Sequence, residues 1–328
     1  MLPQLLIALG SVIVGVALLV WAADRLVAGS AALASHFGVS PLIIGITLVG
    51  FGTSAPEMVV SAIASLEGSP GLAIGNALGS NVANIGLILG ATALVYPLTI
   101  QRSTMVQEFP LLLVVMALSV VVMWDFVFQR HEGVVLLLAL IVVITLMSLL
   151  SLKQPDADPQ ITRLAESIPT QMALPVAIAW AVVGVVVLPL AAHILVQGAV
   201  SIATMFGVSD AVIGLTIVAL GTSLPELAAA MASALKREDD LVIGNILGSN
   251  IFNLLGVLGI SAVIAPMAIA PELITRDLLA MFVITLLLAV FVWRRRGTGR
   301  INRISGALLL IFFVAYQGVI IASALGGR

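Results

Sequence analysis

The stretch GITLVGFGTSAPE at Gly45–Glu57 returns as GLTIVALGTSLPE at Gly214–Glu226, 169 residues further along the chain. A second stretch, IGNALGSNVAN at Ile74–Asn84, returns at the same offset as IGNILGSNIFN at Ile243–Asn253. Each half of the chain therefore carries the same two-part unit. Each unit places one glutamate in an apolar segment, where an ionisable side chain is costly and marks an ion or substrate path by default. The duplication predicts a transporter built from two copies of one module.

The composition is that of an integral membrane protein. Hydrophobic residues make up 61% of the 328 residues and charged residues only 9%, with a mean hydropathy of +1.23. A soluble domain has about 25% charged residues. The net charge of −2 and the lack of a basic tail argue against nucleic-acid binding, and the lack of cysteine excludes disulfides and thiol nucleophiles. The first apolar run, Leu2–Ala22, is too long for a signal-peptide core and predicts a first span instead of a removed leader.

About twenty apolar residues are needed to cross a bilayer, and ten segments of this chain meet that requirement. They lie near residues 3–23, 40–66, 71–95, 105–124, 133–152, 172–200, 208–235, 241–264, 273–293 and 304–324. The only long polar stretch falls between the fifth and sixth segments. It predicts a linker at residues 152–170, with a first repeat at residues 1–151 and a second at residues 171–328.

The distribution of lysine and arginine predicts the orientation of the chain. With the N-terminus outside, eleven of the fourteen basic residues fall on the inner side, and only Arg130, Arg276 and Arg328 fall outside. The positive-inside rule favours this arrangement, with a cytoplasmic linker and both termini outside. Because five is an odd number of spans, two similar halves must cross the membrane in opposite directions. The sequence thus predicts an all-α membrane protein with ten transmembrane helices arranged as two inverted five-helix repeats.

Two of the sixteen acidic residues, Glu57 and Glu226, lie near the middle of a predicted span. Two carboxylates that converge from the two repeats would suit a divalent cation, or several monovalent ones, whose charge offsets theirs. The alternative is that each glutamate is a buried neutral acid held by hydrogen bonds. Pro56 and Pro225 predict a break in each helix at this point, which would free carbonyl oxygens to face a cavity.

Neutral oxygen atoms accompany each glutamate, and hard cations such as Ca²⁺ and Na⁺ prefer ligands of this kind. Hydroxyl groups precede each glutamate by one turn, and the second stretch places a serine and an asparagine four residues apart on one helix face. These candidate ligands are Thr53, Ser54, Ser80, Asn84, Thr222, Ser223, Ser249 and Asn253. The alternative for the hydroxyls is a hydrogen bond to their own backbone. Asn81 and Asn250 point roughly 100° away from these faces and rank lower.

Two further features of the chain have less specific interpretations. The glycines at 75, 79, 244 and 248 form small-residue faces that predict close helix packing. His193, aligned with Asp24 of the first half, is interpreted first as a satisfied membrane histidine and second as a pH sensor.

The paired blocks GTS-x-PE and GN-x-LGSN-x-x-N resemble the cation/calcium exchanger superfamily, in its sodium/calcium exchanger branch of prokaryotic type. The resemblance covers nearly the whole chain. It implies two inverted five-helix repeats with four cation sites clustered at the middle of the membrane. It also assigns ligand roles to both glutamates and to the eight candidate ligands above, and it adds the carbonyl oxygens of Gly50 and Ala219.

The resemblance implies a secondary-active antiporter that exchanges Ca²⁺ for Na⁺ by alternating access. The compactness of the chain favours the inner or plasma membrane of a prokaryote. We expect no cofactor and no obligate protein partner. The expected surroundings of the protein are the lipid bilayer. A proton-coupled antiporter of Ca²⁺ or another divalent cation, with H⁺ as the second ion, is the alternative. That branch typically has GN-x-x-E in place of GTS-x-PE. Some prokaryotic relatives have an aspartate at the position of Asn253, and the asparagine in both halves argues against potassium coupling.

Two other functional classes fit the sequence less well. A cation channel usually forms its pore from a ring of subunits or a filter loop, and the chain has neither pattern. A membrane enzyme would need a nucleophile or an activated acid. Both central acids are glutamates, no GxGD-like sequence occurs, and no serine and histidine are placed to act as a pair. We therefore expect a transporter that is not an enzyme.

Overall fold

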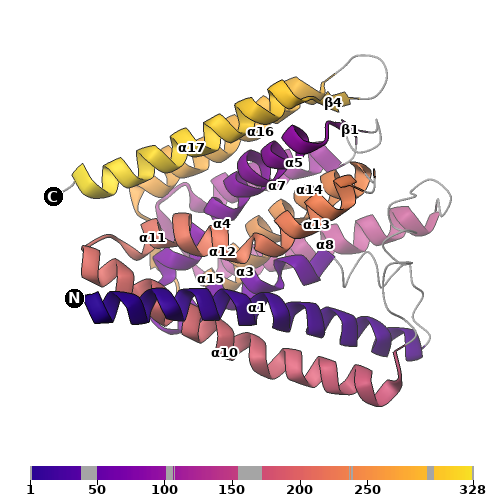
Figure 1. Cartoon of the computed structure of the whole chain (residues 1–328). Helices are drawn as coiled ribbons and strands as arrows, with labels where there is room; N and C mark the ends of the chain where they lie inside the picture. The colour runs from indigo at the N-terminus through magenta and orange to yellow at the C-terminus, as the bar shows by residue number, and fades with distance from the viewer. Residues whose placement is uncertain are drawn as a thin grey trace.

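The computed structural model describes residues 2–37, 50–100, 106, 108–153, 172–235, 237, 239–293 and 299–326. Its helices run broadly along one direction, and both ends of the chain lie at the same end of the bundle (Figure 1). Within the described residues, seven helices are long and apolar enough to cross a membrane. They are Leu2–Ser30, Pro70–Val95, Leu174–Phe206, Asp210–Leu235, Val242–Ile264, Leu273–Val292 and Arg303–Ala324. The protein is thus an all-helical membrane protein, as expected.

Three of the ten expected spans lie outside these seven helices. The helices Ser54–Leu66 and Glu108–Met123 are apolar but shorter, and the segments expected there extend into residues that the structure does not describe. The third segment corresponds to a helix of 24 residues, Arg130–Lys153. The arrangement of ten helices as inverted repeats therefore stays a prediction. The predicted linker, except for its first two residues, lies outside the described part of the chain.

The elements of the first half begin with the longest helix of the chain. In order they are α1 (Leu2–His36), α3 (Gly50–Leu66), α4 (Pro70–Ala83), η2 (Asn84–Leu89), α5 (Gly90–Val95), β1 (Leu98–Ile100), α7 (Glu108–Met123), β2 (Val127–Phe128) and α8 (Arg130–Lys153). The element η2 is a π-helical turn, in which hydrogen bonds join residues five apart instead of four.

The described residues of the second half contain three further π-helical turns. Its elements are α10 (Leu174–Phe206), α11 (Asp210–Ile213), η3 (Gly214–Val218), α12 (Ala219–Thr222), α13 (Leu224–Leu235), α14 (Asp239–Phe252), η4 (Asn253–Val257), α15 (Leu258–Ile264), β3 (Met267–Ala268), η5 (Leu273–Leu278), α16 (Leu279–Val292), β4 (Gly299–Ile301) and α17 (Arg303–Gly326). The helices α16 and α17 lie at the edge of the bundle farthest from α1 (Figure 1).

The offset of 169 residues recurs in the secondary structure. Helices α4 and α14 start and end 169 residues apart, and a π-helical turn follows each of them directly. Two short antiparallel ribbons join the halves crosswise, since β1 pairs with β4 and β2 pairs with β3. The β1–β4 ribbon lies at the end of the bundle opposite the chain termini (Figure 1). Arg300 and Arg303, both expected on the inner side, belong to this end.

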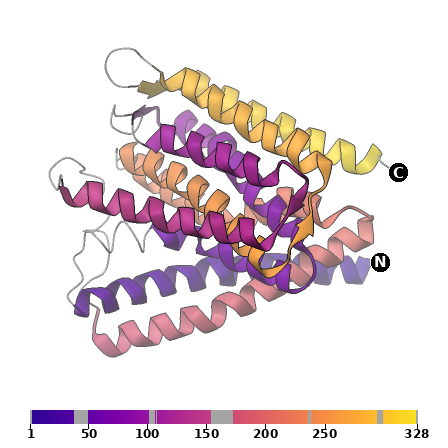
Figure 2. The same ribbon diagram turned by 180° about the vertical axis from the view of Figure 1, so that it is seen from behind.

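Helices α1 and α10 lie side by side in both views (Figures 1 and 2). Glycine allows their backbones to approach closely, because a Cβ on Gly15 would lie 2.8 Å from the amide nitrogen of Leu195. Buried residues of this pair form one hydrophobic cluster together with parts of α3 and α4. The other helices share a second cluster, which packs around α14, η4 and α15.

Glycine also allows α4 to contact the second half. A Cβ on Gly75 would overlap the carbonyl oxygen of Ala211, and one on Gly79 would lie 2.8 Å from the Cβ of Ala219. The predicted close packing is therefore confirmed at these two positions. At Gly248, the counterpart of Gly79, an added Cβ would meet no described residue within 4 Å, so close packing there stays a prediction.

The two central prolines differ in whether the helix is interrupted next to them. Helix α3 continues through Pro56, so the predicted break is wrong in the first half. In the second half α12 ends at Thr222 and α13 begins at Leu224, so the break before Pro225 is confirmed. Proline fits the first turn of a helix, where its missing amide hydrogen would have no intrahelical partner. Inside a membrane helix it is tolerated where neighbouring groups satisfy the backbone.

We predict that Gly75→Ala lowers the thermal stability of the purified protein, because the new methyl group pushes α4 away from α11. Overpacking of this kind costs about 1–3 kcal/mol. The matched control is Gly248→Ala, which adds the same methyl group to α14 where no described residue lies within 4 Å of it. Midpoint temperatures from fluorescence-detected size exclusion would test this. Equal midpoints for the two variants would contradict the packing described here.

Candidate functional site

The two central carboxylates are both buried in the interior of the helix bundle. Glu57 on α3 and Glu226 on α13 are each 1% exposed. The hydroxyl of Ser223 donates to Oε1 of Glu57 at 3.3 Å, and the hydroxyl of Ser249 donates to Oε1 of Glu226 at 3.4 Å. The first of these contacts crosses between the halves. In each carboxylate the second oxygen, Oε2, has no hydrogen-bond partner among the described residues.

The two predicted asparagine ligands make equivalent hydrogen bonds, each to an asparagine of the other half. Asn84 donates from Nδ2 to Oδ1 of Asn250 at 3.0 Å, and Asn253 donates from Nδ2 to Oδ1 of Asn81 at 3.2 Å. All four side chains are buried. The amide oxygens of Asn84 and Asn253 have no hydrogen-bond partner in the described part of the chain. Asn81 and Asn250, which ranked lower on the sequence, therefore contact the predicted ligands directly.

Six buried oxygen atoms of the predicted ligand set lack a hydrogen-bond partner within the residues that the structure describes. They are Oε2 of Glu57 and Glu226, Oδ1 of Asn84 and Asn253, and Oγ of Ser54 and Ser80. A buried polar atom without a partner costs about 1–3 kcal/mol, so six in one set of residues need an explanation. Binding of a hard cation provides one, because Ca²⁺ takes 6–8 oxygen ligands.

Thr222 and Ala219 show the backbone bonding that was the alternative for such groups. The Thr222 hydroxyl lies 3.1 Å from the carbonyl oxygen of Val218, one turn earlier in its own helix. The carbonyl oxygen of Ala219 accepts from the amide of Ser223 at 3.2 Å. Gly50 and the side chain of Thr53 lie outside the residues whose surroundings the structure describes.

Asn76 links several parts of the site, and the sequence interpretation missed it. Its Nδ2 donates to the hydroxyl of Ser61 at 3.0 Å and to the backbone carbonyl of Glu57 at 3.4 Å. Its Oδ1 lies 3.1 Å from the hydroxyl of Thr222, which has one hydrogen to give either to this oxygen or to the Val218 carbonyl, so Asn76 contacts both α3 and α12 from α4. A signal was present, since the asparagine of the repeated GN pair belongs to the second stretch.

Two of the four described π-helical turns begin at predicted ligands. Asn84 is the first residue of η2, and Asn253 is the first residue of η4. A π-helical turn inserts one extra residue per turn and therefore changes the direction of the side chains after it, and such turns occur frequently at functional sites. The sequence interpretation treated both segments as regular helix and did not predict these turns.

The charge of this set of residues is suited to alkali and alkaline-earth cations. Two carboxylates supply the formal charge, and the remaining oxygens are neutral. Within the described residues no group of three or more histidine, cysteine, aspartate or glutamate side chains is placed to hold a metal ion. Oxygen ligands without imidazole or thiolate favour Ca²⁺ and similar hard ions over transition metals.

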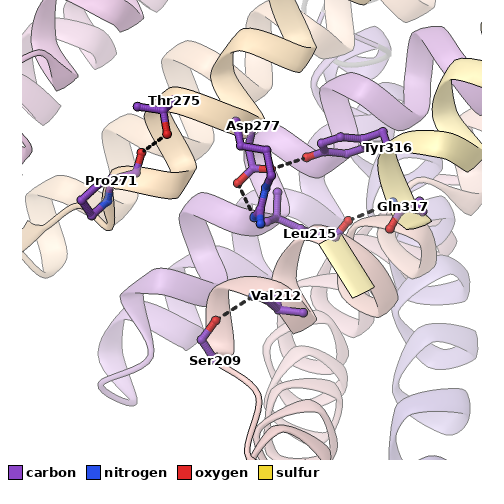
Figure 3. A network of polar contacts seen from close by, with 9 residues as sticks. Ser209, Val212, Leu215, Pro271, Thr275, Asp277, Tyr316 and Gln317 are labelled. Carbon is purple, nitrogen blue, oxygen red and sulfur yellow. Dashed lines mark hydrogen bonds and ion pairs between the residues drawn. The ribbon is translucent and has the colours of Figure 1, made fainter. Parts of the chain in front are cut away.

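A third buried carboxylate, Asp277 in η5, has its own positive partner (Figure 3). Arg276 donates to its two oxygens at 2.8 and 2.9 Å, and the Tyr316 hydroxyl donates to Oδ1 at 3.1 Å. Next to it on α17, Gln317 donates to the carbonyl oxygen of Leu215 at 3.2 Å. Asp277 thus fastens η5 to α17. The sequence placed it near the end of a span and did not predict its burial.

His193 on α10 contacts Glu67, the residue that follows α3. Gln197, one turn further along α10, donates to the same carboxylate at 2.8 Å. The histidine therefore has a hydrogen-bond partner, as its first interpretation expected. It lies apart from the residues predicted to bind a cation.

Known proteins resemble this chain over most of its length. A profile of the family described as sodium/calcium exchanger protein matches residues 7–149 and 176–322. The inner membrane protein YrbG of Escherichia coli (strain K12) is 42% identical over 90% of this chain and 93% of its own. The sodium/calcium exchanger MaX1 of Methanosarcina acetivorans is 29% identical over 94% of this chain and 97% of its own.

The fold also resembles a solved structure. The sodium-calcium exchanger NCX_Mj, in a structure soaked with Na⁺ and Sr²⁺, matches with a TM-score of 0.63 and 32% sequence identity. The match covers 97% of this chain and 99% of the other chain.

We predict that Asn76→Ala destabilises the protein by about 1–3 kcal/mol, because it removes the buried contacts of the Asn76 amide with Ser61, Thr222 and the Glu57 backbone. The matched control is Ser119→Ala, which removes a buried hydroxyl that bonds to the carbonyl of Val115 in its own helix. Thermal unfolding of both variants in the same detergent would measure the difference. An equally small loss of thermal stability in both variants would contradict a linking role for Asn76.

Proposed function

Because this chain belongs to the sodium/calcium exchanger family, we propose that it is a secondary-active antiporter that exchanges Ca²⁺ for Na⁺ across the membrane. Glu57 and Glu226 form the centre of its cation site. The observation that carries this proposal is the set of six buried oxygens without a described partner, to which α3, α4, η2, α13 and η4 contribute. Such a set matches the oxygen coordination that both ions require.

Competition between the two ions follows from the charge of the site. One Ca²⁺ neutralises both carboxylates, whereas Na⁺ does so only when several ions crowd the same oxygens. Binding of one ion therefore disfavours binding of the other, which is the condition for exchange. An exchange of three Na⁺ for one Ca²⁺, as the family resemblance implies, moves one net charge per cycle. Membrane potential would then bias the direction, by about 2.3 kcal/mol per charge at 100 mV.

The architecture that we propose is two inverted five-helix repeats around this site. The equal offsets of α4 and α14, the crosswise β ribbons and the termini at one end of the bundle all support it. Inverted repeats allow a central site to open to each side in turn. We place the protein in the inner or plasma membrane of a prokaryote, with both termini outside.

The ligand set that we propose has members of three kinds. Glu57 and Glu226 provide charge. Hydroxyl and amide oxygens come from Thr53, Ser54, Ser80, Asn84, Thr222, Ser223, Ser249 and Asn253, and carbonyl oxygens from Gly50 and Ala219. Thr222 and Ala219 can bind a cation even while they make their backbone hydrogen bonds, because a hydroxyl or carbonyl oxygen has a second lone pair.

We expect Na⁺-loaded liposomes that contain the purified protein to take up ⁴⁵Ca²⁺ on dilution into Na⁺-free buffer. Choline-loaded liposomes are the negative control, and liposomes with only a pH gradient test the alternative. Uptake that needs the pH gradient and not internal Na⁺ would replace the proposed coupling by proton coupling. Flux that needs no counter-ion would indicate a channel instead.

Glu57→Gln and Glu226→Gln should each abolish this exchange, because the single remaining charge cannot balance a divalent cation. Both variants keep the size of the side chain, so the protein should remain inserted and monodisperse. Asp24→Asn is the matched control, because it removes a carboxylate that is 69% exposed. Retained exchange in either glutamine variant would remove that residue from the site.

We expect the initial rate of Na⁺-dependent Ca²⁺ uptake to fall as the pH on both sides is lowered from 8 to 5. Protons compete with the cations for the carboxylate oxygens of Glu57 and Glu226. Rates measured at saturating and at low Ca²⁺ would separate competition from loss of protein, since saturating Ca²⁺ should restore part of the rate. A rate that rises steadily toward pH 5 would contradict the proposed competition.

A further inference from the structure

Two pairs of asparagines connect the halves of the molecule reciprocally. Asn84 of the first half donates to Asn250 of the second, and Asn253 of the second half donates to Asn81 of the first. In each half the acceptor lies three residues before the donor. Each side chain is at most 1% exposed. Water therefore does not compete for these amide groups, and the partner side chain decides which way each amide faces.

The direction of an amide matters at a cation site. A carboxamide has an oxygen at one end and an NH₂ group at the other, and the two ends have nearly the same shape. Only the oxygen can bind a cation, and the NH₂ group repels it. The backbone does not choose between the two directions. For Asn84 and Asn253 the neighbouring amide oxygen takes the NH₂ end, which leaves Oδ1 buried and without a partner among the described residues.

The orientation of one acceptor is itself fixed. Asn81 donates from Nδ2 to the sulfur of Met281 at 3.3 Å, so its oxygen faces Asn253. A chain of contacts thus runs from α16 through α4 to the first residue of η4. Sulfur is a weak acceptor with no charge. This series of contacts therefore orients the side-chain amide of Asn253 without adding charge to the site.

We propose that Asn81 and Asn250 are positioning residues that turn the amide oxygens of Asn253 and Asn84 toward the transported cation. This inference rests on the proposed function and deepens it, because it assigns the neutral part of the site to residues that do not bind the ion. The attraction between an ion and an amide dipole grows with the charge of the ion. Loss of the orientation should therefore weaken Ca²⁺ binding more than Na⁺ binding.

A double-mutant cycle tests the proposal. Asn81→Leu removes the acceptor while it keeps a side chain of similar size. Asn253→Asp places an oxygen at both ends of the side chain, so its direction no longer matters. If Asn81 acts by turning Asn253, Asn81→Leu should weaken Ca²⁺ binding when Asn253 is intact. It should leave Ca²⁺ binding nearly unchanged when it is combined with Asn253→Asp.

The measurements are equilibrium binding of ⁴⁵Ca²⁺ to the full-length purified protein and the Ca²⁺ dependence of exchange in liposomes. With Asn253 intact we expect Asn81→Leu to raise the Ca²⁺ concentration for half-saturation about tenfold, as loss of a buried hydrogen bond does. The maximal rate and the half-saturating Na⁺ concentration should each change less than about twofold. When Asn81→Leu is added to Asn253→Asp, the change in Ca²⁺ half-saturation should also stay below about twofold.

An equally large loss in both backgrounds would show that Asn81 only supports the packing of α4, and it would overturn the proposal. The same cycle with Asn250→Leu and Asn84→Asp decides the question if Asn81→Leu does not yield folded protein. Ca²⁺ binding without Na⁺-dependent exchange would refute the proposed function, while the binding cycle would still decide the orientation. An unmutated protein that binds no Ca²⁺ would overturn both.

Discussion

Two carboxylates in an apolar interior, with no basic side chain of the described residues paired to them, are the constraint on which the rest of this structure depends. Within the described residues the ion pairs involve Asp24, Glu67 and Asp277, and neither Glu57 nor Glu226. Asp277 shows the other solution, in which a buried acid takes a guanidinium and a phenol as partners. A pair of buried acids without such partners needs protons or mobile cations to balance its charge. The hydroxyl and amide groups around it supply oxygen without adding further charge.

The irregular backbone follows from the same constraint. A straight α-helix directs its carbonyl groups to its own amides and cannot present them to an ion. Here η2 and η4 begin at the two asparagines, and α12 ends at Thr222, with only Ser223 before α13 starts. Small residues then allow the helices to approach, so that side chains of the two halves come into contact, as Ser223 does with Glu57. Regular packing surrounds these turns, because the membrane offers no other partners for the backbone.

The sequence predicted what depends on spacing along one helix. The repeated stretches identified both glutamates, and the four-residue spacing identified Ser80 with Asn84 and Ser249 with Asn253. It could not predict contacts that depend on how the halves meet. Asn76 and the crossed amide pairs are such contacts, since their partners lie more than a hundred residues away. The continuation of α3 through Pro56 and the π-helical turns depend on neighbouring helices, which periodicity does not describe.

The crosswise ribbons have a consequence for how the chain assembles during synthesis. Strand β1 pairs with β4, which is made only when the second half is nearly finished. Strand β2 likewise waits for β3. Until the second half has been made, the backbone groups of β1 and β2 lack their strand partners and must bind water or other groups instead. The first half alone cannot complete either ribbon, so both ribbons join the two halves only late in synthesis.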